Sequence, residues 1–265
     1  MPRAGLVMNY GMEISASGAL SALYRQDVLA NNLANAQTVG FKPDIPAVRL
    51  RAAARDEDGL FGMASNQMLE KLGAGNLPVA NQTSFTQGSL ERTDQDLDVA
   101  IQGDGFFMVR DASDTINPIR VTRDGRFTRS ASGLLVMAAS GLQVLDTAGG
   151  PIPLGGEGKI EIDATGKVKQ GGVEVARIEV LHIPDPWRMP KQGKNVFVPP
   201  VNAVLSRTTG TGLVRQGYVE QSAVDSVKAL MDVTSAGREV EANIAMIRAH
   251  DRMMDRAINA LGRVA

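Results

Sequence analysis

The chain contains no cysteine among its 265 residues, which excludes disulfide bonds, thiolate metal sites and cysteine nucleophiles. It also lacks a long apolar run, because the longest aliphatic stretch, LLVMAA at 134–139, is far too short to span a membrane. The opening residues MPRAGLVMNYGMEISASG contain no apolar block of the kind found in secretory signals. Export by the signal-peptide route is therefore not expected, and export by a dedicated apparatus stays open.

Excess charge and aromatic side chains are scarce as well. Lys and Arg number 28 against 29 Asp and Glu, so the chain lacks the basic excess usual in nucleic-acid-binding proteins. A small basic cluster at Arg49, Arg51 and Arg55 is followed at once by the acidic residues 56–58. We therefore expect no nucleic-acid partner. Aromatics make up only 4% of the chain, which favours helix seams and small β layers over one large enzyme-like core.

The N-terminal stretch from about Met8 to Asn35 has the apolar period of a helix. Apolar or small residues recur there at alternating spacings of four and three, which is typical of a heptad seam. Gly18 weakens this helix without preventing it. Met8 is a candidate start of the protein, because MPRAGLV adds nothing to the pattern. The seam consists of Met12, Ala16, Ala19, Leu23, Gln26, Ala30 and Leu33.

The C-terminal stretch shows the same alternation over a greater length. No proline occurs from Ala223 to Leu261, which predicts a helix about 58 Å long. Ser222 and Asp225 are spaced as a capping box that would open it. The seam consists of Leu230, Val233, Gly237, Val240, Ile244, Ile247, Asp251, Met254, Ile258 and Leu261.

The middle of the chain carries every proline except Pro2 and reads as short strands. Alternating runs such as LDVAIQ, GFFMV and ARIEVLHI are bounded by Gly, Asp and Pro. We predict an α+β fold in which N- and C-terminal heptad helices pack together around an inserted β-rich domain. Residues 8–40 and 216–265 would form the helical assembly domain. Residues 41–215 would form the β-rich domain, with 41–90 as an irregular extended connection.

Catalytic patterns are weak. His182 and His250 cannot be placed together from the sequence, and no GxSxG nucleophile motif occurs. The run GGEGK at 155–159 fails as a phosphate loop, since Pro153 and Ile160 occupy positions that require Gly and Ser or Thr. We therefore predict neither an enzyme nor a cofactor or small-molecule substrate.

Two acidic patterns have a competing structural interpretation. Asp94, Asp96 and Asp98 have calcium-loop spacing, but the Gly and the Glu of such a loop are missing. The alternative is that Asp98 fixes a turn before the next strand. Arg123 and Asp124 are interpreted as part of a solvated hairpin rather than as a catalytic pair.

The stretch ANNLANAQTVGFKPD, at 30–44, contains three asparagines near the predicted helix end. Helix termination needs only one Asn or Gly, and Gly40 would allow the left-handed turn that releases the chain. We therefore favour the hypothesis that Asn31, Asn32 and Asn35 also contact a neighbouring subunit, over simple termination of the helix.

Three blocks in order resemble the bacterial flagellar rod and hook family, the axial proteins of the basal body. They are ALSALYRQDVLANNLANAQTVGFKPD, then QGSLERTDQDLDVAIQGDGFFMVRD followed by VTRDGRFTRSASGLLV, and finally QGYVEQSAVDSVKALMDVTSAGREVEANIAMIRAHDRMMDRAINAL. Gly237 stands in a C-terminal block where the family commonly has an aromatic nearby, and residues 45–83 match poorly. The length favours a rod protein over the hook protein, and proximal and distal rod types both stay open.

The resemblance implies subunits that self-associate in a helical rod through their terminal helices. It also implies partners among other rod and hook proteins and the flagellar export apparatus, and a place in the periplasmic rod of the basal body without a cleaved signal. The assembly interface expected on this basis comprises Leu23, Asn31, Asn32, Leu33, Asn35, Gly40, Leu230, Val233, Val240, Ile244, Ile247, Met254, Ile258 and Leu261.

Two other classes of function remain as alternatives at this point. The β-rich domain could be a soluble adaptor that oligomerises through a helical stalk outside the flagellum, forming a small discrete oligomer. A rod-associated peptidoglycan hydrolase would need a catalytic carboxylate or a metal constellation, which the sequence does not supply.

Overall fold

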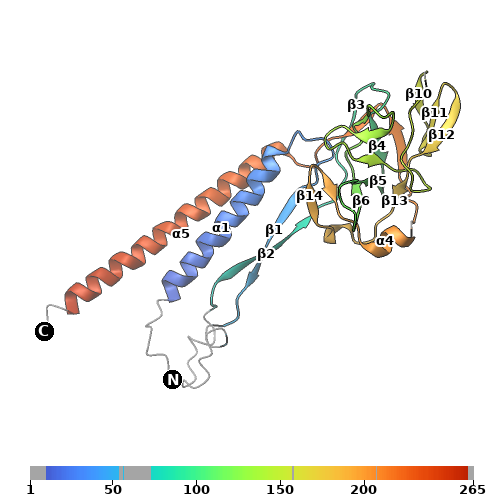
Figure 1. Ribbon diagram of the computed structural model, residues 1–265. Helices are drawn as coiled ribbons and strands as arrows, with labels where there is room; N and C mark the ends of the chain where they lie inside the picture. The colour runs from blue at the N-terminus through green and yellow to red at the C-terminus, as the bar shows by residue number, and fades with distance from the viewer. Residues whose placement is uncertain (1–9, 54–55, 57–72, 157, 207, 262–265) are drawn as a thin grey trace. The chain divides into compact units, whose positions relative to one another are not determined.

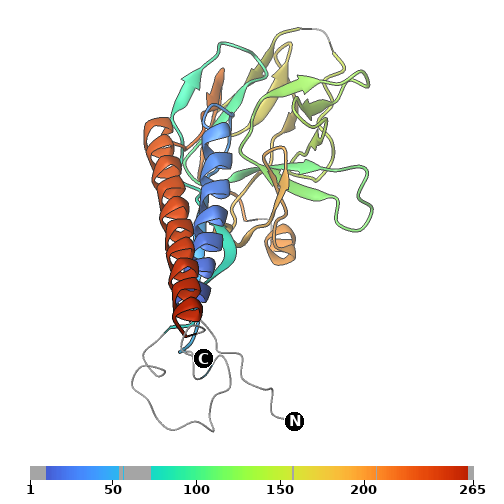
Figure 2. The ribbon, with the colours of Figure 1, turned by 90° about the vertical axis from the view of Figure 1, so that its left-hand side faces the viewer.

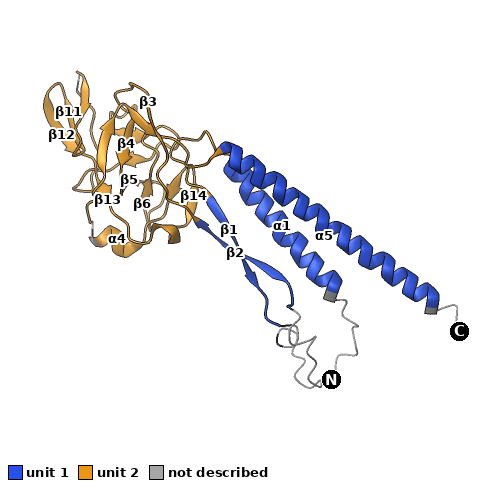
Figure 3. Ribbon diagram, turned by 180° about the vertical axis from the view of Figure 1, so that it is seen from behind, with its two compact units in different colours: residues 1–33, 44–82, 226–265 blue, residues 34–43, 83–225 orange. Residues whose placement is uncertain are grey.

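The computed structural model describes residues 10–53, 56, 73–156, 158–206 and 208–261 (Figure 1). The chain divides into two compact units, coloured separately in Figure 3. Unit 1 comprises residues 1–33, 44–82 and 226–265, and unit 2 comprises residues 34–43 and 83–225. The predicted order of an N-terminal helix, a β-rich region and a C-terminal helix is confirmed.

Unit 1 contains the two long helices. Helix α1 spans Tyr10–Ala34 and helix α5 spans Ser226–Leu261, whose 36 residues correspond to about 54 Å. The predicted capping box does not open α5, which begins after Asp225. The backbone N–H of Ala223 donates to Phe41 O at 3.3 Å, and Ser222 Oγ accepts the nearby N–H of Val224. No described helix is long and apolar enough to cross a membrane.

Unit 1 also contains a two-stranded sheet formed by β1, Asp44–Leu50, and β2, Asn76–Thr83, whose last residue belongs to unit 2. These strands lie in the stretch expected to be an irregular connection, so the structure differs there. The prolines Pro46 and Pro78 weakened the strand signal. In a sheet of two strands each strand is an edge, where a proline is tolerated.

Unit 2 is a set of short antiparallel strands. The main sheet has eight, in the order β14-β15-β6-β5-β9-β8-β7, with β13 also paired to β5. Smaller sheets pair β10-β11-β12, β16-β4 and β17-β3. The strand bounds are β3 Leu90–Arg92, β4 Val99–Gln102, β5 Phe106–Arg110, β6 Ile119–Thr122, β7 Phe127–Arg129, β8 Leu135–Met137, β9 Gln143–Val144, β10 Ile160–Ile162, β11 Lys167–Gln170, β12 Val173–Arg177, β13 Val180–Leu181, β14 Lys191–Gly193, β15 Val196–Phe197, β16 Leu213–Gln216 and β17 Tyr218–Glu220. Two short helices are η1 Pro186–Arg188 and α4 Val201–Ser206.

The core of unit 2 forms two apolar clusters. The larger is centred on the strand interiors of β4, β5 and β8, where Phe107 packs edge-on against Phe127 with ring centroids 5.2 Å apart. In the smaller cluster, Phe85 packs against Phe106 and Phe197. Strands were correctly expected here, but β4, β5 and β8 are buried on successive residues and therefore on both faces, rather than on the one face that an alternating pattern predicts.

The turn after β6 differs from its prediction. Arg123 and Asp124 were expected in a solvated hairpin, but they are 5% and 0% exposed. Strands β6 and β7 do not pair with each other. The carboxylate of Asp124 instead accepts hydrogen bonds from Arg126 Nη2 at 2.7 Å and from the backbone N–H of Arg126 at 3.1 Å. A charged turn can be buried in this way because its carboxylate is fully paired.

Candidate assembly surface and junction segments

Helices α1 and α5 run side by side in opposite directions (Figures 1 and 2). Arg25 Nη1 lies 3.3 Å from Glu239 Oε2, and a Cβ added at Gly18 would lie 2.8 Å from Asn243 Oδ1. A Cβ at Gly11 would likewise lie 2.6 Å from His250 Cε1. The small residues of α1 therefore leave room for the side chains of α5.

The buried positions of α5 are displaced by one residue from part of the predicted seam. Ala229, Ala236 and Val240 are buried, while the predicted seam residues Leu230 and Ile244 are 55% and 38% exposed. The small residues next to the large ones thus occupy the covered face. After His250 every side chain described in α5 is exposed, including Met254 and Ile258 at 42% and 63%.

The other predicted interface residues divide into two groups. Leu23, in α1, is 42% exposed and Asn31 is also exposed. Leu33, Val233 and Ile247 are partly buried, and the side chain of Leu261 lies outside the described residues. Exposed and covered members of the predicted interface therefore alternate along the helices.

A second face of α1 is covered by the β1-β2 sheet. Tyr24 Oη donates to Asn81 Oδ1 at 2.6 Å, and Ser17 Oγ accepts from the backbone N–H of Asn76 at 3.3 Å. The sheet itself leaves large apolar side chains in solvent. These are Ile45, Val48, Leu50, Leu77 and Val79, between 37% and 79% exposed.

The three asparagines have different surroundings. Asn32 is 6% exposed, and its amide bonds both backbone groups of Asp44, donating to O at 2.7 Å and accepting from N–H at 2.9 Å. The side chain of Asn35 accepts from Thr38 Oγ1 at 3.2 Å, as expected of a residue that ends a helix. The side chain of Asn32 therefore binds the first residue of β1 in its own chain, rather than being available to a neighbouring subunit.

Gly40 has the left-handed conformation predicted for it, with φ +70°. Its N–H donates to Glu220 O at 2.7 Å, and a Cβ there would lie 2.7 Å from Asp124 N. Both the turn and the close approach of the backbone require glycine at this position.

A cluster of charged side chains is buried beside Gly40. Lys42 Nζ lies 2.5 Å from Glu220 Oε1, and both side chains are fully buried. Arg123 Nη1 lies 3.3 Å from Glu220 Oε2, and the guanidinium of Arg123 lies over the Phe106 ring at 5.0 Å. Two cations thus share one carboxylate in the interior of unit 2.

Backbone carbonyls and amides complete this cluster. Lys42 Nζ donates to Thr86 O at 2.8 Å, and Arg123 Nη2 donates to Gly103 O at 2.9 Å. Glu220 Oε1 accepts the backbone N–H of Gly88 at 2.9 Å. These bonds offset part of the desolvation of the buried charges.

Burial lowers the pKa of Lys42 below its ordinary value, and the neighbouring Glu220 opposes that effect. Burial lowers the pKa of Arg123 in the same way, again against the attraction of Glu220. Removal of Glu220 would therefore leave both cations without the group that favours their charged forms.

The hairpin of β14 and β15 holds the same segment from another side. Lys191 Nζ donates to Lys42 O at 2.6 Å, and its ammonium lies 4.7 Å from the Phe41 ring centre. Asn195 Nδ2 donates to Val39 O at 2.8 Å. The segment 39–43 is therefore fixed along its whole length within unit 2.

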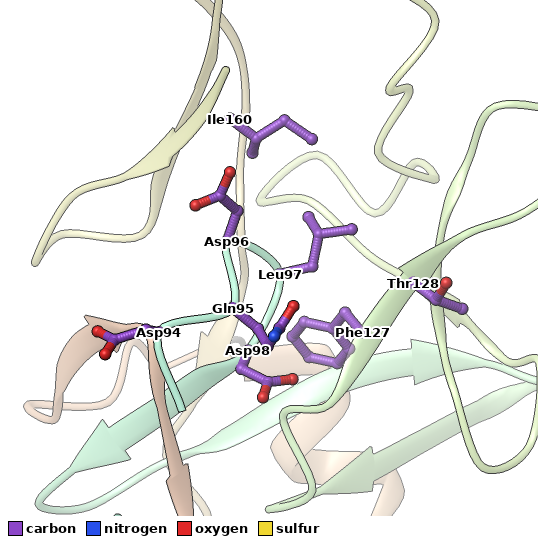
Figure 4. Close-up of a pocket in the computed structure, with 8 residues that line it drawn as sticks. All are labelled: Asp94, Gln95, Asp96, Leu97, Asp98, Phe127, Thr128 and Ile160. Atoms are coloured by element: carbon purple, nitrogen blue, oxygen red, sulfur yellow. The ribbon is translucent and has the colours of Figure 1, made fainter. Parts of the chain in front are cut away.

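The acidic stretch at 94–98 borders an open pocket of about 530 Å³, whose apolar lining includes Leu97 and Phe127 (Figure 4). Figure 4 shows Asp94, Asp96 and Asp98 pointing in different directions. Asp94 forms an exposed ion pair with Arg92. No group of three or more metal-ligating side chains is found in the described parts of the chain.

The sequence interpretation missed the buried cluster. Its three members, Lys42, Arg123 and Glu220, occur in GFKPD, VTRDGRF and QGYVEQS, which are the three blocks singled out above. The signal that could have indicated the cluster is that each of the three blocks contains a charged residue, with two cations and one carboxylate that could pair with one another. Their burial could not be inferred, because charged side chains are mostly exposed.

Comparison with known proteins gives matches along most of the chain. The model described as flagella basal body rod protein matches residues 12–42. The flagellar hook protein FlgE/F/G D1 domain matches residues 100–173, and the flagellar basal body rod FlgEFG protein C-terminal domain matches residues 215–260.

Individual relatives align over nearly their full length. The chain is 30% identical to the flagellar basal-body rod protein FlgF of Caulobacter vibrioides, over 97% of this chain and 100% of that protein. It is 28% identical to the flagellar basal-body rod protein FlgG of Bacillus subtilis, over 92% and 96% of the two chains. It is 27% identical to the flagellar hook-basal body complex protein FlhO of the same species, over 96% and 99%.

Proposed function

The chain belongs to the family of flagellar basal-body rod proteins, and on that premise we propose how it works as a structural subunit of the rod. Copies polymerise helically through the terminal helices of unit 1, together with other rod and hook proteins. The resulting rod crosses the periplasm and transmits rotation. In this proposal the protein passes through the flagellar export apparatus without a cleaved signal, and it has no catalytic activity and takes no cofactor.

The observation that carries this proposal is the exposure of large apolar side chains in unit 1. Leu20, Leu230, Met231 and Ile258 are each more than half exposed, and others lie along β1 and β2. Covering one such side chain completely contributes about 1.5–3 kcal/mol. Several of them on one subunit supply enough driving force for association with neighbouring subunits.

We assign the two sides of the heptads different tasks. The small residues at 229, 236 and 240 pack α5 against α1 in the same subunit, and the large residues beside them face neighbouring subunits. Leu23, Leu230, Ile244, Met254 and Ile258 are the central contacts in this assignment. Val233, Ile247, Leu33 and Leu261 border them, and Val240 supports them from the covered side.

The asparagines are divided in the same manner. Asn31 is exposed and is assigned to the interface, with Asn35 at its edge. Asn32 and Gly40 support the interface indirectly, because their contacts lie within the chain. Replacing Asn31 with Ala should therefore impair assembly while the β-rich unit stays folded.

The proposal is tested by purifying hook–basal bodies from cells whose only copy of the protein carries a tag. Tagged protein in the detergent-resistant rod, and loss of rods on deletion, are the expected results. Absence of the protein from basal bodies in motile cells would contradict the proposal and favour the adaptor function.

A matched pair of variants makes the test specific to unit 1. Ile258→Lys changes an isoleucine that is 63% exposed in α5, and Ile116→Lys changes one that is 94% exposed in unit 2. The first should prevent incorporation into rods and the second should not. Equal incorporation of both would remove α5 from the interface.

A further inference from the structure

The chain passes between the two units at four points, which all lie on three segments of unit 2. Residues 34–43 carry two of these points, the segment that starts at Thr83 carries one, and the segment that ends at Asp225 carries one. Any force or motion that passes along the chain between the units enters unit 2 through these segments.

Backbone hydrogen bonds join the three segments pairwise. The N–H of Ser84 donates to Pro43 O at 2.8 Å, which joins the first to the second. The N–H of Gln221 donates to Ser89 O at 2.8 Å, which joins the second to the third. Gly40 and Ala223 join the first to the third through Glu220 O and Phe41 O.

The buried ion pair lies where all three segments meet. Lys42 belongs to the first segment, and its ammonium also binds Thr86 O of the second. Glu220 belongs to the third, and its carboxylate also binds the N–H of Gly88 in the second. One pair of side chains therefore contacts every segment through which unit 2 joins unit 1.

We call the three segments of unit 2 described above the junction segments. We propose that the Lys42–Glu220 pair couples these junction segments, so that they open only together. Its separation leaves charged groups without partners in the interior, so no segment can detach alone without exposing the other two. A force that enters on one segment is then shared by all three. Arg123 binds the other carboxylate oxygen of Glu220 and is itself held by Gly103 O and the Phe106 ring.

A buried ion pair can instead be exchanged for uncharged groups of similar volume with little effect on folding. Lys42→Met with Glu220→Gln keeps the volume and an oxygen that can accept the N–H of Gly88. In this double variant Arg123 keeps its bond to Gly103 O but loses its carboxylate partner, so some general loss of stability is expected. The sheet should remain folded while the link between the segments is lost, and amides elsewhere in the sheet measure the general loss. The stability of the fold and the coupling of the segments can then be measured separately.

The test is hydrogen exchange of the purified full-length chain as a function of low denaturant concentration, read amide by amide by NMR. In the wild type, the amides of Gly40, Ser84, Gly88 and Gln221 should share one opening free energy and one denaturant dependence. Distinct values for the three segments would overturn the proposal without any variant being required.

In the double variant, the same four amides should exchange about tenfold to a hundredfold faster, as the loss of charge-assisted bonds predicts, and with separate opening free energies. The amides of Leu135 and Leu154 are the internal controls, because they bond to Ile152 O and Gly133 O elsewhere in the sheet. Unchanged junction amides, or an equal increase at the control amides, would show that the pair only contributes to overall stability, which overturns the proposal.

Discussion

Units 1 and 2 differ in whether their large apolar side chains are buried or exposed. Unit 2 buries most of its phenylalanines and many of its leucines and isoleucines in two clusters, although Ile116 and Leu205 are exposed. Among the described residues of unit 1, the buried apolar side chains are small, namely Ala19, Ala22, Ala229, Ala236 and Val240. Its leucines, isoleucines and methionines are largely exposed.

This difference shows which unit is completed by its own chain. Burial contributes about 0.8 kcal/mol for each CH₂ group, so alanines contribute little and phenylalanines contribute much. Unit 2 has exposed ion pairs such as Lys167–Glu174, but the fully buried pair among the described residues also lies there. Unit 2 buries the Lys42–Glu220 pair completely, whereas the Arg25–Glu239 pair of unit 1 is about half exposed on both sides. In the proposed rod, unit 1 would therefore gain more than unit 2 from contacts with neighbouring subunits.

The largest effect should follow from breaking the buried pair on one side. Glu220→Leu leaves Lys42 without a counter-charge and Arg123 with Asp104 alone, which should reduce the free energy of unfolding of unit 2 by about 3–5 kcal/mol. Urea denaturation followed by circular dichroism measures this change. Glu174→Leu, which removes an exposed partner of Lys167, should cost less than about 1 kcal/mol. Both carboxylates belong to unit 2, so similar losses for the two variants would contradict the difference between buried and exposed ion pairs.

Two glycines sharpen the comparison, because the same substitution should act in opposite directions. Gly40→Ala forces a side chain against the Asp124 backbone at positive φ, which should cost about 1–3 kcal/mol. Gly18→Ala meets only the end of the Asn243 side chain, which can rotate, and it gains up to about 1 kcal/mol of helix propensity. Thermal unfolding of both variants decides this, and a large loss at Gly18 would show that unit 1 is as tightly packed as unit 2.

A smaller effect is expected at the exposed pair of unit 1. Arg25→Ala removes the contact with Glu239 and should lower stability by about 0.2–1 kcal/mol. The loss should fall further in 1 M salt, where exposed charges are screened. Urea denaturation at low and high salt provides the measurement. A loss that does not depend on salt would indicate that the aliphatic part of Arg25 is the important contact.

The smallest effect concerns pH and one loop of unit 2. The backbone N–H of Asn117, the Arg120 side chain and the N–H of Ile116 together lower the pKa of Asp114 below its ordinary value of 3.8. A carboxylate with a lowered pKa stabilises the folded state above its unfolded pKa, and this contribution is lost as the pH falls through the folded pKa.

The loop at 111–118 should therefore keep its structure at pH 5 and loosen only in stronger acid. An NMR titration of the Ile116 amide gives the midpoint. Asp114→Asn keeps the acceptor oxygen without the charge and should remove this transition. A midpoint above 3.8 in the wild type would contradict the expected direction.

The sequence was informative where a pattern repeats. The three–four spacing located both terminal helices, and short apolar runs bounded by Gly and Asp located strands such as 106–110. The sequence could not show which apolar residues of α5 face α1 and which face solvent. Ala229 and Leu230 both fit an apolar stripe, and their burial depends on the position of α1. The sheet of β1 and β2 was missed because proline masks edge strands.

The junction shows the same limit for the candidate site. Gly40 was correctly predicted to take a left-handed turn, since local geometry alone requires it. Lys42 and Glu220 are separated by 178 positions along the chain, and no local pattern connects them. The placement of the interface residues in neighbouring subunits stays a prediction.

The pairing of β3 and β4 has a consequence for the order of folding. Strands β3 and β4 pair with β17 and β16, which come near the end of unit 2 in the sequence. Lys42 likewise pairs with Glu220 from that late segment. Closing such long loops is slow, because the entropy of the chain is lost before the contacts form. A chain that emerges with its N-terminus first therefore cannot pair β3 and β4 until residues 213–220 have appeared. Until then these two small sheets of unit 2 stay unformed.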